Sequence, residues 1–391
     1  GRMDPVFLKQ AMNPTDEVLV RHLAEKYPGL YTNALSDGGG RQMGLRETMS
    51  VTDYQSLYVD VLDRMYYGFY NAHPIVNKSL DRWTELVGAA KRSDEKQLML
   101  FPEFALQGFP IHESAEEWIA KACFQIPGPE TERLQKLAQD NKIYIGANSY
   151  ETDAEWPGRY FNCSYLIDDT GEIILKYRRI NTAHSASPHD FLDKYLDKYG
   201  IEGMFPVAKT PMGNIGMMPC GEIMYPEAAR ALAFRGAEVI LHPTSDYGAD
   251  DNWSWQSAKK VRASENMVYL ISANAGGMPE AYRGVNDIAG QSRIFDWEGR
   301  VLTQGPTPGE SLRCSSLIDV EALRRVRSTR GGFNRLAQAR PEAYAALYAS
   351  TSIYPVNRFA DKPMESRKAV KDALNDALDN MVQNDMLPPR K

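Results

Sequence analysis

Apolar and polar positions follow a regular succession of helix-like and strand-like patterns through most of the chain. Apolar residues spaced three and four apart predict helices over 77–93, 130–142, 227–236 and 253–267. Short apolar runs and alternating stretches predict strands over 63–71, 96–104, 143–151, 237–246 and 268–277, with one more leading into Pro219. This alternation is typical of an α/β protein.

Two hairpins interrupt the alternation. Residues 159–179 form two strand patterns separated by the turn sequence Asp-Asp-Thr-Gly at 168–171, and residues 290–304 form a second pair. Hairpins among helices favour a layered α/β sandwich over a purely parallel sheet. No GxGxxG follows the first predicted strand, which argues against a dinucleotide-binding fold.

The two ends differ in composition from the middle. Residues 1–60 are polar and rich in turn-forming residues, which predicts an N-terminal arm, and residues 61–320 contain the predicted α/β domain. Residues 321–391 are charged and predicted to be helical, with patterns at 320–328 and 365–383. We expect this C-terminal extension to contact another subunit.

Composition and charge exclude several classes of protein. The net charge is −6 and no block of basic residues occurs, so nothing indicates a nucleic-acid partner or an anionic membrane surface. No stretch approaches the roughly 20 apolar residues of a membrane helix, and the first residues contain no apolar signal core. We therefore expect a cytoplasmic protein.

Metal and disulfide sites are not predicted. The four cysteines are scattered without a CxxC pair, which argues against a zinc site and against a disulfide framework. The six histidines show neither HxH nor HExxH spacing. We expect no metal and no cofactor, and any cysteine with a chemical role would act alone.

Cys220 is the candidate for that role. Pro219, Cys220 and Gly221 lie between a predicted strand and the helix that follows, with little side-chain bulk around the sulfur. At such a turn the first amides of the next helix would favour the thiolate and could stabilise an oxyanion. The alternative is that Cys220 packs in the core, where cysteine is common.

Glu103 is the second candidate. It ends a predicted strand that is otherwise apolar, in the sequence Phe-Pro-Glu-Phe at 101–104. A buried carboxylate is costly unless it is paired or functional, and burial would raise its pKa so that it could act as a general base. The alternative is a surface or helix-capping carboxylate.

Five segments together resemble the nitrilase superfamily of carbon–nitrogen hydrolases. They are LMLFPEFALQGFP at 98–110, GEIILKYRR at 171–179, CGEIMYPEAARALAFRGAEVILHPT at 220–244, RASENMVYLISAN at 262–274 and GQSRIFDWEGRVL at 290–302. The resemblance implies a four-layer αββα sandwich that pairs into an αββααββα dimer, or a higher homo-oligomer. It also implies attack of a cysteine on an amide, carbamoyl or nitrile carbon through a thioester.

The resemblance assigns roles to three residues. Glu103 matches the general base, Cys220 the nucleophile, and Arg179 occupies the place of the lysine that usually donates to the oxyanion. Three interpretations stay open: Arg179 replaces the lysine, Lys176 replaces it by a shift of register, or the site is weakened. Lys176 and Arg179 are an odd number of residues apart, so on a regular strand they point to opposite faces. We favour Arg179.

Substrate contacts are predicted around these residues. The resemblance makes Gly221, Glu222, Tyr225 and Thr244 candidates, and the loop after Arg179 adds His184, with His189 and Asp190 as local alternatives. Each histidine could instead bond its own loop. Gly221 replaces a tryptophan typical of nitrile-cleaving members, so we expect a wider pocket. Aromatic residues that could line the acyl site, or only pack in the core, are Tyr247, Trp253 and Trp255.

The sequence therefore predicts a cysteine-dependent hydrolase of non-peptide carbon–nitrogen bonds. The expected substrate is a small amide or N-carbamoyl compound, cleaved to an acid and ammonia or an amine. Nitrile hydrolysis, a non-catalytic scaffold and a soluble acyltransferase are the alternatives.

Overall fold

The computed structural model describes residues 73–90, 97–108, 110, 113–182, 185–246, 253–275, 290–305 and 314–388. The predicted N-terminal arm at 1–60 and the predicted strand at 63–71 lie outside these ranges. Within them, no helix combines the length and the apolar character needed to cross a membrane.

The first sheet is mixed, with the strand order β1-β3-β4-β5 and β2 paired to β3. β1 and β3 are parallel, whereas β3, β4 and β5 are antiparallel to one another in turn. The strands are β1 (Leu98–Leu100), β2 (Phe124–Gln125), β3 (Tyr144–Thr152), β4 (Tyr160–Ile167) and β5 (Ile173–Arg178). The predicted hairpin at 159–179 is confirmed.

The second sheet has the order β11-β10-β9-β8-β7-β6. Its central strands β7, β8 and β9 are parallel, and its outer pairs are antiparallel. The strands are β6 (Val207–Thr210), β7 (Gly213–Met217), β8 (Val239–Thr244), β9 (Tyr269–Asn274), β10 (Arg293–Phe295) and β11 (Val301–Gln304). Both sheets are mixed, as the hairpins among helices predicted.

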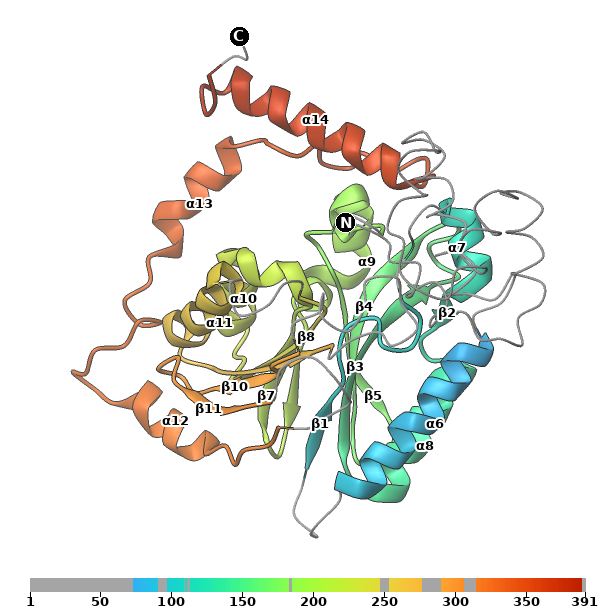
Figure 1. Ribbon diagram of the computed structural model, residues 1–391. Helices are drawn as coiled ribbons and strands as arrows, with labels where there is room; N and C mark the ends of the chain where they lie inside the picture. The colour runs from blue at the N-terminus through green and yellow to red at the C-terminus, as the bar shows by residue number, and fades with distance from the viewer. Residues whose placement is uncertain are drawn as a thin grey trace, which may run out of the picture. The chain divides into compact units, whose positions relative to one another are not determined.

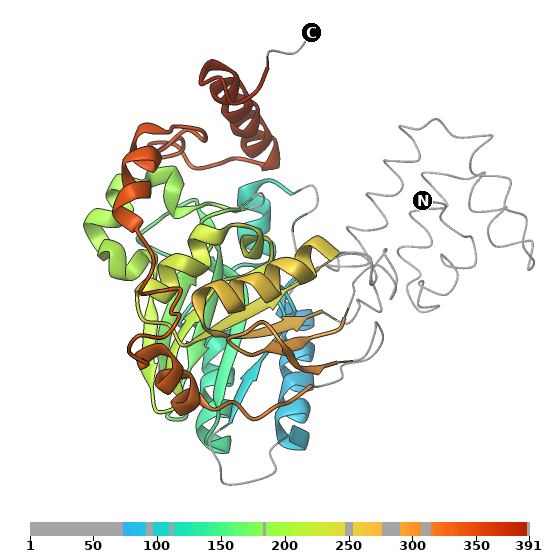
Figure 2. The ribbon, with the colours of Figure 1, turned by 90° about the vertical axis from the view of Figure 1, so that its left-hand side faces the viewer.

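Helices cover the outer faces of the two sheets (Figures 1 and 2). One buried cluster joins α6 (His73–Ala90) and α8 (Pro129–Asn141) to the first sheet. A second cluster joins the inner faces of both sheets and extends to α10 (Pro226–Phe234) and α11 (Trp253–Asn266). The layers are therefore α, β, β, α, and the predicted αββα sandwich is confirmed.

The sheets approach closely at Gly146 on β3. A Cβ atom there would lie 2.9 Å from Leu100 Cδ1 and 3.1 Å from Leu241 Cδ1 of the facing sheet. Leu241 is fully buried. Burial of such side chains stabilises the interface between the sheets by about 25 cal/mol per Å² of apolar surface removed from water.

The sequence patterns missed several elements. They are α7 (Ala115–Ala122), the 3₁₀ turn η1 (Pro188–Phe191), α9 (Leu192–Met204), α13 (Pro341–Ser350), β2 and β6. A clear signal was present for α7, because Ser114 and Glu117 form a capping box at its start. α9 was harder to see, because Gly200 interrupts its helical backbone at φ +62°.

The C-terminal extension contains the two predicted helices, α12 (Val320–Ser328) and α14 (Arg367–Gln383). α12 is tied to the second sheet by an ion pair from Arg324 Nε to Glu238 Oε1 at 2.7 Å. The expected contact of this extension with another subunit stays a prediction. The domain limits at residues 60 and 320 also stay predictions.

Candidate active site

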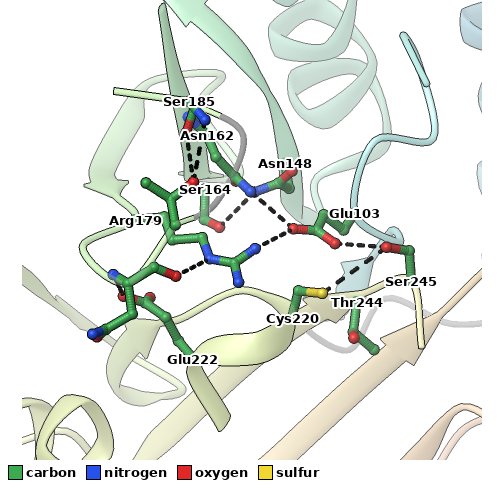
Figure 3. A network of polar contacts seen from close by, with 12 residues as sticks. Glu103, Asn148, Asn162, Ser164, Arg179, Ser185, Cys220, Glu222, Thr244 and Ser245 are labelled. Atoms are coloured by element: carbon green, nitrogen blue, oxygen red, sulfur yellow. Dashed lines mark hydrogen bonds and ion pairs between the residues drawn. The ribbon is translucent and has the colours of Figure 1, made fainter. Parts of the chain in front are cut away.

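A cluster of polar side chains lies where strands of both sheets end (Figure 3). Its members come just after four strands: Glu103 after β1, Arg179 after β5, Cys220 after β7 and Ser245 after β8. Each of these residues lies within three positions of the end of its strand. Residues far apart in sequence therefore meet at one edge of the sandwich.

The turn that carries Cys220 has a strained backbone. Pro219 is extended at φ −91°, and Cys220 has a left-handed φ of +47°. For a residue other than glycine this conformation costs about 1–2 kcal/mol. Residues Cys220–Met224 then form the 3₁₀ turn η2, and α10 begins only at Pro226. The predicted helix at 227–236 is therefore confirmed as α10, and the chain makes this tighter turn between Cys220 and that helix.

Glu103 lies at the centre of the cluster and is only 1% exposed. Its Oε1 accepts hydrogen bonds from Asn162 Nδ2 at 2.8 Å and Arg179 Nη1 at 3.2 Å. Its Oε2 accepts one from Ser245 Oγ at 2.7 Å. The hydroxyl of Ser245 also lies 4.0 Å from Cys220 Sγ, so it links the carboxylate to the thiol (Figure 3). The buried carboxylate is therefore well partnered.

The electrostatic surroundings of Cys220 and Glu103 favour the protonated form of the Cys220 thiol. Burial and, after it, the charge of Glu103 raise the pKa of Cys220 to about 12, although the Arg179 charge opposes the rise. Burial also raises the pKa of Glu103, against the opposing effect of the Arg179 charge and of its hydrogen bonds. Desolvation thus opposes ionisation of the thiol more strongly than the Arg179 charge favours it. A base is needed to remove the proton.

Arg179 and Lys176 occupy different surroundings. Arg179 reaches Glu103, and its Nε donates to the Asn181 carbonyl oxygen at 2.8 Å. Lys176 forms an ion pair with Glu151 and donates to the Ile126 carbonyl oxygen at 2.6 Å. Of the two cations, Arg179 is the one beside Glu103 and Cys220 (Figure 3).

This fold and cluster lie within a segment that matches a known family. The family model described as carbon-nitrogen hydrolase matches residues 74–328, which include all three residues carried over from the resemblance. The chain belongs to the carbon-nitrogen hydrolase family. The resemblance to the nitrilase superfamily is confirmed.

Named relatives agree with this membership. A formamidase of Bacillus cereus (strain B4264) is 30% identical over 211 residues, which are 54% of this chain and 58% of the formamidase. The chain thus spans 58% of the length of that relative. An amidase from Nesterenkonia sp. aligns at 22% identity with a TM-score of 0.52, over 70% of this chain and 90% of its own.

A carbon-nitrogen hydrolase from Helicobacter pylori G27 aligns at 20% identity with a TM-score of 0.55, covering 73% of this chain and 96% of its own. At these identities the solved structures show the fold alone.

Gly221 and Glu222 follow the cysteine and contact the segment that carries Arg179. Arg179 Nη2 is so close to Gly221 that a Cβ there would lie 2.7 Å from it. The expectation that Gly221 widens the pocket is therefore wrong on this side, because the guanidinium occupies that space. The Glu222 carboxylate accepts hydrogen bonds from Tyr177 Oη at 2.8 Å, Ile180 N at 2.8 Å and Asn181 N at 2.9 Å. It holds the backbone next to Arg179, and a contact with substrate stays a prediction.

Thr244, Tyr225 and His189 were also predicted to contact substrate. Thr244 is buried and its hydroxyl donates to Asp246, whereas Tyr225 is 46% exposed. His189 packs edge-on against Tyr354, with ring centroids 5.7 Å apart. Their roles toward substrate stay predictions.

Asp190 accepts a hydrogen bond from Ser187 N at 2.8 Å within its own loop. The indole of Trp255 packs against the second buried cluster and would lie 3.6 Å from a Cβ on Gly221. His184, Tyr247 and the side chain of Trp253 lie outside the described residues.

Three further residues belong to the site and were not predicted: Ser245, Asn162 and His242. The signal for Asn162 was a polar residue within an apolar strand, the same signal that identified Glu103. His242 Nε2 donates to the Cys220 carbonyl oxygen at 2.9 Å, and its Nδ1 pairs with Ser272 Oγ at 2.9 Å. Ser245 could have been found only from the pairing of β8 with β7 and β9.

Metal ligands do not gather at this site. Among the residues that the structure describes, no group of three or more histidine, cysteine or acidic side chains is arranged to hold a metal ion. A metal-free reaction stays a prediction.

Proposed function

We propose that this family member hydrolyses the carbon–nitrogen bond of a small linear amide or N-carbamoyl compound through a thioester on Cys220. The observation that supports it most is the buried cluster in which one carboxylate pairs with a guanidinium and is linked to a thiol through the Ser245 hydroxyl. A thiol, a base and a fixed positive charge are the three groups that acyl transfer to sulfur requires.

Glu103 moves the protons in this proposal. It takes the proton of the Cys220 thiol as the sulfur attacks the carbonyl carbon, and the carbonyl oxygen becomes an oxyanion beside Arg179. Glu103 then gives the proton to the leaving nitrogen as the carbon–nitrogen bond breaks. In the second half, Glu103 takes a proton from water, which adds to the thioester, and returns it to sulfur as the carbon–sulfur bond breaks.

The charges of the site suit these roles. A thiol with a pKa of about 12 is protonated at neutral pH and depends on an adjacent base. Burial brings the pKa of Glu103 upward, nearer to the pH at which it must both accept and release protons. Arg179 stays protonated, because Cys220, Glu103 and Glu222 raise its pKa although burial opposes its charge.

The relatives' names support an amide substrate over a nitrile. They are called formamidase and amidase, and this chain has Gly221 where tryptophan is typical of nitrile-cleaving members. We further propose a cytoplasmic enzyme that forms a homodimer or a higher homo-oligomer, as the nitrilase resemblance implied.

The test uses the full chain with a panel of small amides, N-carbamoyl compounds and nitriles. Release of ammonia or amine is measured together with the intact mass, which detects an acyl adduct. We expect turnover to be abolished in Cys220→Ala and Glu103→Gln and kept in Cys314→Ala, a matched control whose thiol bonds the Ser292 carbonyl oxygen instead. Turnover of nitriles alone would support the nitrilase alternative. Failure to turn over any of these compounds and to form any adduct would support the scaffold.

A further inference from the structure

Gly221 lacks a side chain at a position where its backbone would accept one. Its φ does not lie in the left-handed range, so an alanine is not strained by the backbone itself. The obstacle is the guanidinium of Arg179, since a Cβ on Gly221 would lie 2.7 Å from Nη2. The next neighbour, Trp255 Cη2, would lie at an ordinary 3.6 Å. Within the part of the chain that the structure describes, Arg179 is thus the one residue that conflicts with a Cβ at position 221.

The guanidinium is held in that place by two hydrogen bonds. Nε donates to the Asn181 carbonyl oxygen at 2.8 Å, and Nη1 donates to Glu103 Oε1 at 3.2 Å. The backbone of Asn181 is itself fixed, because its N–H donates to Glu222 Oε1 at 2.9 Å. To avoid a new Cβ, the guanidinium of Arg179 would have to shift, which would weaken one or both of these hydrogen bonds.

We propose that Gly221 is a positioning residue for Arg179, and that positions 221 and 179 act as a coupled pair. The absent side chain at position 221 leaves the volume in which the planar guanidinium lies beside Cys220 and Glu103. A side chain at 221 avoids this conflict when the cation at 179 has no second terminal nitrogen, as in lysine. The proposal rests on the proposed function to the extent that Arg179 assists the reaction.

The position of the Arg179 guanidinium also affects the reactivity of the Cys220 thiol, which can be measured without turnover. The Arg179 charge opposes the rise of the Cys220 pKa, so displacing that charge makes the thiol harder to ionise. The same charge lowers the pKa of Glu103. Alkylation of Cys220 by iodoacetamide as a function of pH therefore reports the position of the guanidinium even without a substrate.

The experiment compares four full-length proteins: wild type, Gly221→Ala, Arg179→Lys and the double variant. We expect Gly221→Ala to lower kcat/KM by roughly 10- to 100-fold, the loss typical of removing a charged hydrogen-bond donor. It should also move the alkylation profile of Cys220, followed by peptide mapping, to higher pH. In the Arg179→Lys background, Gly221→Ala should change kcat/KM and the rate of Cys220 alkylation by less than about threefold each.

Controls separate positioning from damage to the fold. Gly88→Ala is a matched substitution on α6 with no atom within 4 Å of the new Cβ, and it should leave activity and alkylation unchanged. The melting temperature of Gly221→Ala should stay close to that of wild type, because the conflicting atom is the far end of a flexible side chain. Circular dichroism and thermal melts of all variants check this.

Two results would overturn the pairing. One is an equal effect of Gly221→Ala in both backgrounds, and the other is an alkylation profile that does not move in Gly221→Ala. Failure of the proposed function looks different: Cys220→Ala would keep its turnover, or no substrate would be cleaved. The alkylation comparison would then still decide whether positions 179 and 221 are coupled.

Discussion

Ser245→Ala tests whether the Glu103 carboxylate is the base that limits activity at low pH. Ser245 Oγ donates to Glu103 Oε2 at 2.7 Å, whereas Oε1 keeps its separate donors, Asn162 and Arg179. A donor to the charged form holds the pKa of Glu103 down against the effect of burial. Its removal therefore raises that pKa.

The size of the effect follows from the strength of the lost bond. A hydrogen bond to a charged group contributes about 1.5–3 kcal/mol, and one pKa unit corresponds to about 1.4 kcal/mol. The pKa of Glu103 should thus rise by about one to two units. If Glu103 is the general base, kcat/KM falls at low pH where the carboxylate gains a proton, so this limb should move to higher pH by the same amount.

The assay is kcat/KM for the best amide substrate from about pH 4 to about pH 9. Ser149→Ala is the control, because it also removes a buried serine hydroxyl, one that pairs with Tyr165 Oη at 3.4 Å. It should lower stability without moving the acid limb. An unmoved limb in Ser245→Ala, or an equal movement in Ser149→Ala, would refute the reasoning.

Two further predictions concern the support of the site. His242→Ala removes the hydrogen bond to the Cys220 carbonyl oxygen, and a loss of about 1–3 kcal/mol should lower kcat roughly 5- to 150-fold. Burial lowers the pKa of His242 to about 4, so the defect should be the same at every pH from about 6 to about 8. Arg178→Met leaves the buried Glu151 without one of its cations, and chemical denaturation should show a loss of about 3–5 kcal/mol. The exposed control Arg82→Met should change stability by no more than about 0.5 kcal/mol.

Much of the fold could be predicted from local patterns, because each strand and helix of the sandwich buries one face or both. The hairpin at 168–171 is an example: Asp168 Oδ1 accepts hydrogen bonds from Thr170 N at 2.9 Å and Glu172 N at 3.0 Å, and Gly171 takes a φ of +90°. All of these contacts join near neighbours, so the sequence alone contains the signal. α13 was not predicted, because it has no buried residue and no strong apolar periodicity that would indicate an amphipathic helix.

The candidate site divides in the same way. Glu103 and Cys220 could be identified from a polar residue ending an apolar strand and from a cysteine in a glycine-rich turn. Ser245 and His242 could not, because their partners Glu103 and Cys220 are 142 and 22 residues away and meet them only through the packing of strands.

The sequence by itself determined the α/β class, the family and the two residues proposed as base and nucleophile, since each depends on residue type and near neighbours. Only the tertiary structure decided that burial raises the pKa of the Cys220 thiol and that the space beside Gly221 is occupied by Arg179. Both outcomes are set by desolvation and by distances across two sheets. These quantities depend on which strands lie side by side, and local patterns along the sequence do not give that information.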